Sequence, residues 1–339
     1  MKNCYILFLF LFSNIFLFAQ SFTTIPGTDG LSKATAYQIW TNGHLMELGD
    51  SINSKHPPYY LSWSADKHFK LMQDINDPIT RSIGQTSFLG HFHGNGKKIT
   101  VAITPSYYTP PYSSASVFVE LSYNASIDSL TIDGYINYSA DEGAVGIVIT
   151  VGAGYNSSGI VSNCINNINT NIAGITQHNQ GTIINCINNG DITGVDRIGG
   201  IAGENSGQII NCINTGKITA TNSGTNADPL GNLTPDNGVG GIVGYINNAC
   251  TGIINCINLG NIEGQGRVGG IIGTALGHFM YPTQITNCVN YGYIKGTSAV
   301  GGIAGIMWGG IYANVNISNC VNAGVVEGES DVGSITGKE

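Results

Sequence analysis

Cysteine is the residue type whose placement in this sequence most suggests chemistry. The tetrapeptide Asn-Cys-Ile/Val-Asn occurs six times and accounts for six of the eight cysteines. The copies are Asn163–Asn166, Asn185–Asn188, Asn211–Asn214, Asn255–Asn258, Asn287–Asn290 and Asn319–Asn322. Regularly spaced thiols in an exported chain suggest disulfides or a bound metal ion as the first hypotheses.

The repeated context favours a structural column of free thiols over both hypotheses. Equivalent residues on successive layers of a β-structure lie about 4.8 Å apart with parallel Cβ vectors. That spacing is wider than the Cβ separation of about 3.8 Å in a disulfide. A buried free cysteine behaves as a small apolar residue. Cys250 lies outside the repeated position, and the sequence leaves open whether it pairs with Cys256.

Two histidines are the next candidates for chemistry. His91 and His93 are two positions apart, so on a strand their side chains would point the same way, towards a shared metal ion. No third ligand follows within reach in the sequence, and the Gly-Gly-x-Gly-x-Asp pattern of calcium-binding repeats is absent. We therefore predict no metal site and no cofactor.

One position of the repeat, directly after the apolar residue of its second run, carries charge in several copies. Its occupants are Thr193, Thr219, Glu263, Lys295 and Glu327. Carboxylates on neighbouring layers could serve as the acid and base of a glycoside hydrolase. Glu263 and Glu327 are separated by a layer bearing Lys295, a pattern that favours an exposed ion-pair ladder.

The spacing of the repeats indicates the elements that must hold these residues. Successive cysteines of the tetrapeptides are 22, 26, 44, 32 and 32 residues apart. In copies two, four, five and six, nine positions separate the glycine after the tetrapeptide from a Gly-Gly pair or its remnant. Copy three carries an insertion, Thr221–Asn237, within this segment. A constant spacing interrupted by loops at fixed places is typical of a solenoid.

Each repeat is expected to form one coil of a parallel β-helix. In copy two, Ile183–Asn188 would be a strand and corner, Asp191–Thr193 a second strand and Ile198–Gly203 a third. Helical solenoids are excluded because the units contain several glycines and no apolar stripe of period 3.6. Asparagines at one corner would bond to their neighbours above and below, and glycines would supply positive φ at the turns.

The predicted fold is all-β: a single-stranded parallel β-helix with a short N-terminal capping region that contains one helix. Residues 1–20 have the short apolar run of a secretory signal peptide. Residues 21–105 would form the cap and first β segments, with a helix from Thr41, a strand at Phe69–Ile75 and a turn at Asn95-Gly96. Residues 106–339 would form the repeats.

Two glycine-rich segments resemble the GLUG-motif repeats of exported bacterial surface proteins. They are Ile198–Gly203 and Val268–Gly273, and Phe88–Gly96 resembles the F-x-G-x-F-x-G-N-G segment that commonly precedes such repeats. These repeats occur in adhesin-like proteins and in the non-catalytic region of some immunoglobulin A peptidases. The resemblance implies a right-handed parallel β-helix and a location at the cell surface, and it brings no catalytic residues.

Composition and aromatic residues lead to the functional prediction. The net charge of −8 and the lack of a basic stripe disfavour nucleic acid and an anionic membrane as partners. No apolar run after residue 20 is long enough to insert into a membrane. Aromatic side chains on one flank could stack on sugar rings or pack against a protein. The predicted binding residues are Tyr281, Tyr291, Tyr293, Trp308 and Tyr312.

The sequence therefore predicts a secreted or surface-exposed scaffold for recognition or adhesion, with no catalysis of its own. Its partner would be a glycan or a protein of a host or another cell. The alternatives are a carbohydrate-active β-helix enzyme, either a polysaccharide lyase or a glycoside hydrolase, and a purely structural stalk.

Overall fold

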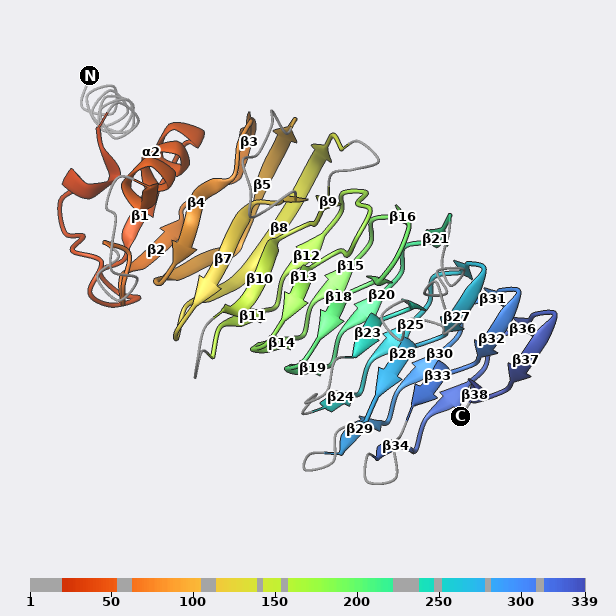
Figure 1. Cartoon of the computed structure of the whole chain (residues 1–339). Helices are drawn as coiled ribbons and strands as arrows, with labels where there is room; N and C mark the ends of the chain where they lie inside the picture. Colours follow the sequence, from red (N-terminus) through yellow and green to blue (C-terminus); the bar gives the residue numbers. More distant parts are fainter. Residues whose placement is uncertain are drawn as a thin grey trace, which may run out of the picture.

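The chain forms a long stack of β-strand coils, with its single described α-helix at the N-terminal end (Figure 1). The computed structural model describes residues 20–53, 63–104, 114–138, 143–153, 158–221, 238–246, 252–277, 282–308 and 314–338. The predicted signal peptide lies almost wholly outside these residues. Every strand pairing in the described part of the chain is parallel and joins neighbouring coils, so the architecture is a parallel β-helix. Its predicted right hand stays a prediction.

One coil of the array consists of five short strands. In copy two these are β13 (Thr176–Asn179), β14 (Thr182–Ile184), β15 (Ile187–Asn188), β16 (Ile192–Gly194) and β17 (Ile198–Gly199). Strands in the positions of β14 and β15 belong to a seventeen-stranded sheet, and those in the position of β13 form a nine-stranded sheet. Strands in the positions of β16 and β17 form two separate five-stranded sheets.

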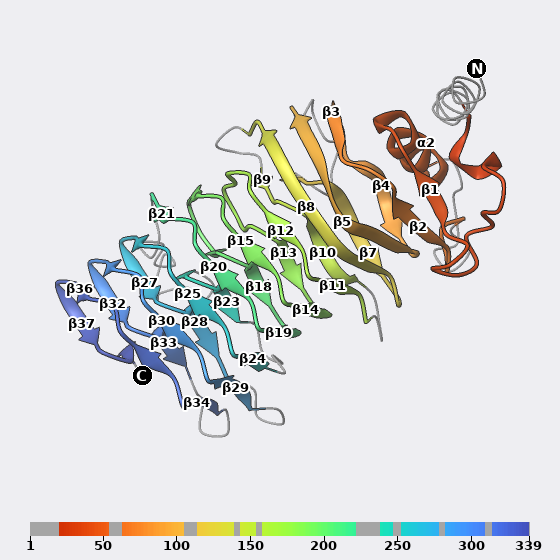
Figure 2. The same ribbon diagram turned by 180° about the vertical axis from the view of Figure 1, so that it is seen from behind.

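The other coils of the array repeat this pattern, as the view from behind also shows (Figure 2). Copy one has β10 (Val148–Ala153), β11 (Ile160–Ser162) and β12 (Ile165–Asn166). Copy three has β18 (Ala202–Asn205), β19 (Gln208–Ile210), β20 (Ile213–Asn214), β21 (Ile218–Ala220) and β22 (Val239–Gly240). Copy four has β23 (Val243–Ile246), β24 (Gly252–Ile254), β25 (Ile257–Asn258), β26 (Ile262–Glu263) and β27 (Gly266–Gly269).

The last coils are equally regular. Copy five has β28 (Ile272–Leu276), β29 (Thr283–Thr286), β30 (Val289–Asn290), β31 (Ile294–Lys295) and β32 (Ser298–Gly301). Copy six has β33 (Ala304–Trp308), β34 (Val315–Ser318), β35 (Val321–Asn322), β36 (Val326–Glu327) and β37 (Ser330–Gly333), and β38 (Thr336–Lys338) follows.

The N-terminal region contains coils of the same stack. The short helix η1 (Phe22–Thr24) and β1 (Tyr37–Ile39) precede α2 (Asn42–Asn53). Then come β2 (His68–Leu71), β3 (Ile75–Ile79), β4 (Ile83–Phe88), β5 (His91–Ile103), β6 (Ser114–Ala115), β7 (Phe118–Ser122), β8 (Ser126–Ile136) and β9 (Gly143–Ala144). Because β1, β2, β5 and β8 pair within the seventeen-stranded sheet, coils stack on both sides of residue 106.

The helix predicted from Thr41 is confirmed, and it covers the N-terminal end of the stack. The Thr41 hydroxyl accepts a hydrogen bond from His44 N at 3.2 Å, as an N-cap residue does. Leu45, Leu48 and Ile52 on the apolar face are buried. The helix α2 therefore packs against the first coils and covers apolar surface that would otherwise face water.

The cysteine column forms as predicted. Five repeat cysteines are fully buried free thiols, and Cys320 in the last copy is partly exposed. Cys256 is one of the free thiols, while Cys250 lies outside the described residues. Burial raises the pKa of the Cys186 thiol well above its usual value, which keeps it protonated and unreactive.

The two asparagines of each tetrapeptide form two separate ladders. The first asparagine is exposed and has positive φ, and Asn185 Nδ2 donates to Asn163 Oδ1 at 3.1 Å. The second is buried, and Asn188 Nδ2 donates both to Asn214 Oδ1 and to Gly190 O at 2.8 Å. The same bonds recur along the array, so these buried amides keep their hydrogen-bond partners.

Glycines pack against the buried asparagines, and together they divide each coil into two apolar compartments. A Cβ atom on Gly200 would lie 2.4 Å from Asn214 Cγ, and one on Gly241 would lie 2.5 Å from Asn258 Cγ. The larger compartment contains the cysteines. The smaller one lies between the two five-stranded sheets and contains Ile192, Ile198, Ile218, Val239, Ile262, Val268, Ile294 and Val300. We call the part of each coil around this smaller compartment the lobe.

Four local predictions were wrong. The single strand predicted at Phe69–Ile75 is two strands, β2 and β3, separated by residues 72–74. The predicted third strand, Ile198–Gly203, is two strands with a corner at Gly200, because Ile198 faces the lobe and Ile201 faces the larger compartment. The Gly-Gly pairs are needed for close packing, not for positive φ, which the repeats place mainly at asparagine. Asn95-Gly96 has positive φ but forms a bulge within β5, where the register against β8 shifts.

Candidate functional site

The densest group of chemically active side chains lies on three neighbouring strands of the first coils. Residues His68 of β2, His91 of β5 and Ser126 of β8 are register partners in one row. In the next row, His93 is opposite Asp128. In each strand a buried aromatic or aliphatic residue separates the two polar positions, so the polar side chains share the outer face. We call these five residues the histidine cluster.

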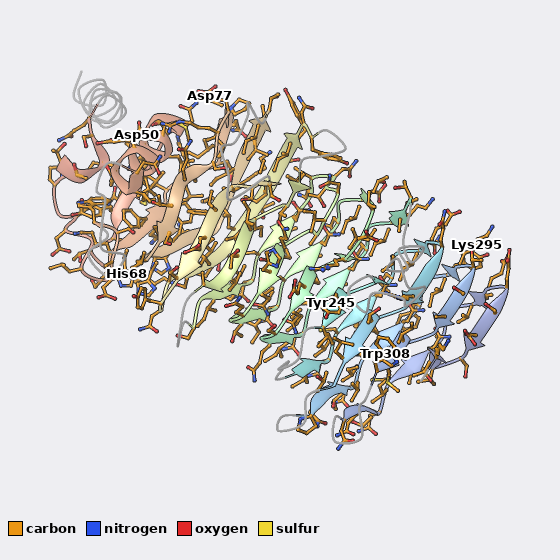
Figure 3. The ribbon with its side chains drawn as sticks, in the orientation of Figure 1. Asp50, His68, Asp77, Tyr245, Lys295 and Trp308 are labelled. Atoms are coloured by element: carbon orange, nitrogen blue, oxygen red, sulfur yellow. The ribbon has the colours of Figure 1, made fainter. Side chains whose placement is uncertain are left out.

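Hydrogen bonds connect the histidine cluster into a chain. Asp128 Oδ2 lies 2.5 Å from His93 Nδ1, and His93 Nε2 lies 2.9 Å from His68 Nδ1. The third imidazole, His91, places its Nδ1 2.9 Å from the Ser126 hydroxyl. The rings of His68 and His91 stack with their centroids 4.5 Å apart. His93 is buried in the middle of this chain of bonds, whereas His68 at its end, labelled in Figure 3, is partly exposed.

The chain of bonds determines the tautomers. An ionised carboxylate only accepts hydrogen bonds, so His93 Nδ1 must donate to Asp128. When the His93 ring is neutral, its Nε2 carries the lone pair and accepts from His68 Nδ1–H. A neutral His68 then carries its own lone pair on Nε2. The carboxylate therefore orients two imidazoles in series, and the free lone pair is at the outer end.

Neighbouring groups shift the pKa values of the cluster. Burial, followed by the charges of His91 and His93, lowers the pKa of His68. Burial and the charge of His93 likewise lower the pKa of His91. Burial raises the pKa of Asp128, but the hydrogen bond from His93 and the charges of His93 and Lys33 lower it by more, so the net shift of this pKa is downward. Near neutral pH the cluster thus holds an ionised carboxylate beside neutral His68 and His91.

The sequence identified His91 and His93 but missed the residues that adjacent coils bring to them. His68 and Asp128 come from 23 and 35 residues away along the chain and meet His91 and His93 through strand stacking. The signal that could have found them is the shared polar-apolar-polar triplet His68-Phe69-Lys70, His91-Phe92-His93 and Ser126-Ile127-Asp128. Within the described residues, no group of three or more His, Cys, Asp or Glu is arranged to hold a metal ion.

The charged column predicted from the repeats forms on one face of the lobe. Thr193, Thr219, Glu263, Lys295 and Glu327 are consecutive register partners. Their bonds differ from the predicted ladder. Glu263 pairs with Lys217 at 3.5 Å, and Glu327 accepts a hydrogen bond from the hydroxyl of Tyr293. These charges are exposed, and the two carboxylates are each engaged by a neighbouring side chain.

The predicted aromatic residues lie on two sides of the last coils. Tyr291 and Tyr293 flank the turn before β31, and Trp308 ends β33 in the nine-stranded sheet. Figure 3 shows Trp308 well separated from Lys295, the last residue of β31. Tyr291 and Trp308 are about half exposed, at 57% and 49%. Tyr281 and Tyr312 lie outside the described residues.

A second polar group, not predicted from the sequence, lies between the lobe and the nine-stranded sheet. Glu204 lies 3.4 Å from both Arg197 and His178, and the Arg197 guanidinium lies over the ring of Tyr245 at 5.4 Å. Tyr245 is almost fully buried. The charged and aromatic side chains of this group interact with one another, and their contacts connect the lobe to the nine-stranded sheet.

Of the comparisons with known proteins, the one with solved structures supports the fold. No protein-family model matches the chain, and no curated protein matches it. It is similar to a crystal structure from Bacteroides ovatus, described as a candidate immunoglobulin A1 protease. The TM-score is 0.56 at 18% sequence identity, and the alignment covers 93% of this chain and 91% of that chain. At this identity the similarity shows a common fold.

Proposed function

We propose that this protein is an exported recognition scaffold whose repeat coils present binding side chains to a glycan or a protein partner. The predicted export signal at residues 1–20 and the resemblance of the glycine-rich segments to GLUG-motif repeats support a location outside the cell or on its surface. Within the described residues, no helix is both long enough and apolar enough to cross a membrane.

The observation that carries the proposal is the contrast between the inside and the outside of the repeat coils. The cysteine, the buried asparagine and the Gly-Gly pair occupy the same inward positions in successive coils, where they serve packing. Apart from the exposed asparagine ladder, outward positions change from one coil to the next, as the column from Thr193 to Glu327 illustrates. A rigid shaft with a variable surface suits binding, because little conformational entropy is lost when a partner docks.

The binding residues we propose are the exposed aromatic side chains of the last two coils. Tyr291 and Trp308 each present a large apolar surface beside polar groups, which suits stacking against a sugar ring or packing against a protein. They lie on two sides of the shaft, so each would contribute to a separate contact. Tyr293 bonds to Glu327 and would support the first contact.

The name of the Bacteroides ovatus protein raises the enzyme alternative for this chain. The carboxylates of the lobe column do not favour it, because Glu263 and Glu327 are exposed and each is engaged by a neighbouring side chain. A general acid needs a raised pKa, which an enclosing site provides. We therefore propose that the repeat coils act by binding alone.

A glycan array and a panel of extracellular matrix proteins, probed with the purified chain, test the proposal. We expect binding to at least one of them, and a loss of affinity of about tenfold or more in Tyr291→Ala or Trp308→Ala. Tyr135→Ala is the matched control, since Tyr135 is 53% exposed in an early coil. Unchanged affinity in both aromatic variants, or no binding to any ligand, would contradict the proposal.

A further inference from the structure

The histidine cluster is far from the last coils and plays no part in the binding proposed for them (Figure 3). Its order of groups is carboxylate, buried imidazole, exposed imidazole. In the hydrolytic triad of serine enzymes, a carboxylate orients an imidazole, and that imidazole acts on the reacting hydroxyl. Here the group that donates a hydrogen bond to the oriented imidazole of His93 is itself a base, His68.

We propose that His68 is a general base that catalyses the hydrolysis of carboxylic esters, and that His93 and Asp128 position it. The geometry supplies what such a base requires. When His93 is neutral, its Nε2 accepts the hydrogen bond from His68 Nδ1–H, which fixes the orientation of the His68 ring and leaves the lone pair of His68 Nε2 without a partner among the described residues. The bond between His93 and Asp128 fixes the tautomer of His93 and places a negative charge at the buried end.

The reaction is a simple two-step hydrolysis. A water oxygen attacks the ester carbonyl carbon while its proton moves to His68 Nε2, and the carbonyl electron pair moves onto the oxygen. When the carbonyl re-forms, the bond to the alcohol oxygen breaks, and the leaving alkoxide takes the proton from His68 Nε2. An ester and a water thus become a carboxylic acid and an alcohol, and His68 regains its neutral form.

The surrounding charges suit both steps. The imidazolium formed in the first step is stabilised by Asp128 through His93, as the aspartate of a triad stabilises its histidine. Lys33 Nζ, which lies 3.9 Å from Asp128 Oδ1 and is 65% exposed, provides a nearby positive charge for the developing oxyanion. Lys70, the register partner of His93, is a second cation beside the cluster.

The protonation state also suits a base. Burial and the charges of His91, His93 and Lys33 lower the pKa of His68, while the charge of Asp128 acts in the opposite direction. His68 is therefore neutral at neutral pH and able to accept a proton. The charges of Asp66 and Asp128 raise the pKa of His91, but burial and His93 lower it by more. His91 is therefore also neutral at neutral pH.

The test is the hydrolysis of 4-nitrophenyl acetate by the full chain, followed through release of 4-nitrophenolate. Accessible thiols also attack this ester, so Cys4→Ser, Cys250→Ser and Cys320→Ser are introduced throughout as the reference background. We expect kcat/KM to fall by about tenfold or more in His68→Gln. His178→Gln is the control, because His178 lies in the repeat array and is also partly exposed.

The pH profile separates a positioning role of Asp128 from a merely structural one. In the reference chain we expect the rate to rise as His68 loses its proton and then to level off. Because Asp128 raises the pKa of His68, Asp128→Asn should move the midpoint of this rise to lower pH and lower the plateau. Asp128→Glu should restore part of the plateau. Circular dichroism confirms that each variant is folded.

The proposal is overturned if His68→Gln keeps the rate of the reference chain, or if urea-unfolded reference chain hydrolyses the ester as fast as the folded chain. An Asp128→Asn profile with an unchanged midpoint would also overturn the positioning role. Since Tyr291 and Trp308 are far from the cluster, loss of esterase activity with retained glycan binding, or the reverse, distinguishes this proposal from the recognition function.

Discussion

At the scale of single residues, close packing decides which side chains the repeats tolerate. Gly200 shows this best, because its backbone lies against the amide of Asn214 and the carbonyl oxygen of Gly241 in the next coil. A Cβ atom there would be 2.2 Å from Gly241 O, a distance that real Cβ atoms do not adopt. The Gly-Gly pairs of the motif are thus explained by contact between neighbouring coils.

We predict that Gly200→Ala destabilises the protein by about 2 kcal/mol or more, because backbone and a buried ladder must both move. Chemical denaturation of the purified variant measures this. Gly43→Ala is the control, since Gly43 lies in α2 and a Cβ there meets only Thr41 Oγ1, at 3.4 Å. Alanine favours helix, so the control should be neutral or stabilising. Equal losses in the two variants would refute the explanation.

At the scale of elements, stacked strands create sites that no single segment contains. The tetrapeptides and their spacing were sufficient to predict the parallel coils, the thiol column and the asparagine ladder, because each depends on one repeating position. The histidine cluster was not predicted: the sequence singled out His91 and His93, but His68 and Asp128 join them only through the pairing of β2, β5 and β8. The spacing of those N-terminal coils is irregular, so their register could not be read from the sequence.

The division of each coil into two compartments was missed for a related reason. Ile198 and Ile201 are three positions apart in one apolar run, and nothing in the run shows that they face different cores. The corner between them depends on Gly200 packing against Asn214, a residue of the next coil. Contacts between coils, which sequence periodicity does not encode, decide where such a run bends.

The elements of the histidine cluster should lose stability in mild acid. His68 and His91 have folded-state pKa values below the ordinary 6.5, so the unfolded chain binds more protons as the pH falls. Their contribution to stability is therefore complete above about pH 6.5 and is lost as the pH falls below it. The lowered pKa of Asp128 affects stability only at much lower pH: its contribution is complete above the ordinary pKa of 3.8 and is lost as the pH falls below that value.

We predict a lower melting temperature at about pH 5 than at about pH 7.5, followed by circular dichroism. In His68→Gln/His91→Gln the difference between the two pH values should shrink, because two imidazoles no longer gain protons on unfolding. Thr193→Ala, which removes an exposed side chain that carries no titratable group, serves as the control, with the difference unchanged. A double variant that keeps the full difference would show that other groups cause the acid sensitivity.

At the scale of the whole molecule, burial declines towards the last coil. The larger compartment is closed at one end by α2, whereas several apolar residues of the last described coil are exposed, among them Val321, Val325 and Val332. The thiol column follows the same trend, since Cys164 to Cys288 are buried and Cys320 is partly exposed. Among the repeat cysteines, only the one in the last described coil is thus accessible.

This gradient predicts the order of thiol reactivity. In a chain with Cys4→Ser and Cys250→Ser, we expect a disulfide reagent such as Ellman's reagent to modify Cys320 first. The five buried thiols should react only on unfolding, because burial protects them and raises the pKa of Cys186. Peptide mass mapping after brief labelling identifies the modified residue. Simultaneous labelling of Cys212 and Cys320 in native conditions would contradict the stacked arrangement.

The separate core of the lobe has a consequence for how such proteins can change. The connection between Ala220 and Val239 joins the two strands of one lobe, and there copy three carries the longest insertion of the repeats. The lobe packs on its own apolar residues, which the buried asparagines and the glycines separate from the larger compartment. A change in the length of the connection between the two lobe strands, the lobe tip, therefore leaves the larger compartment unchanged. Each lobe tip is therefore a point where new loops can accumulate by mutation, or be grafted by design, without a new shaft having to evolve.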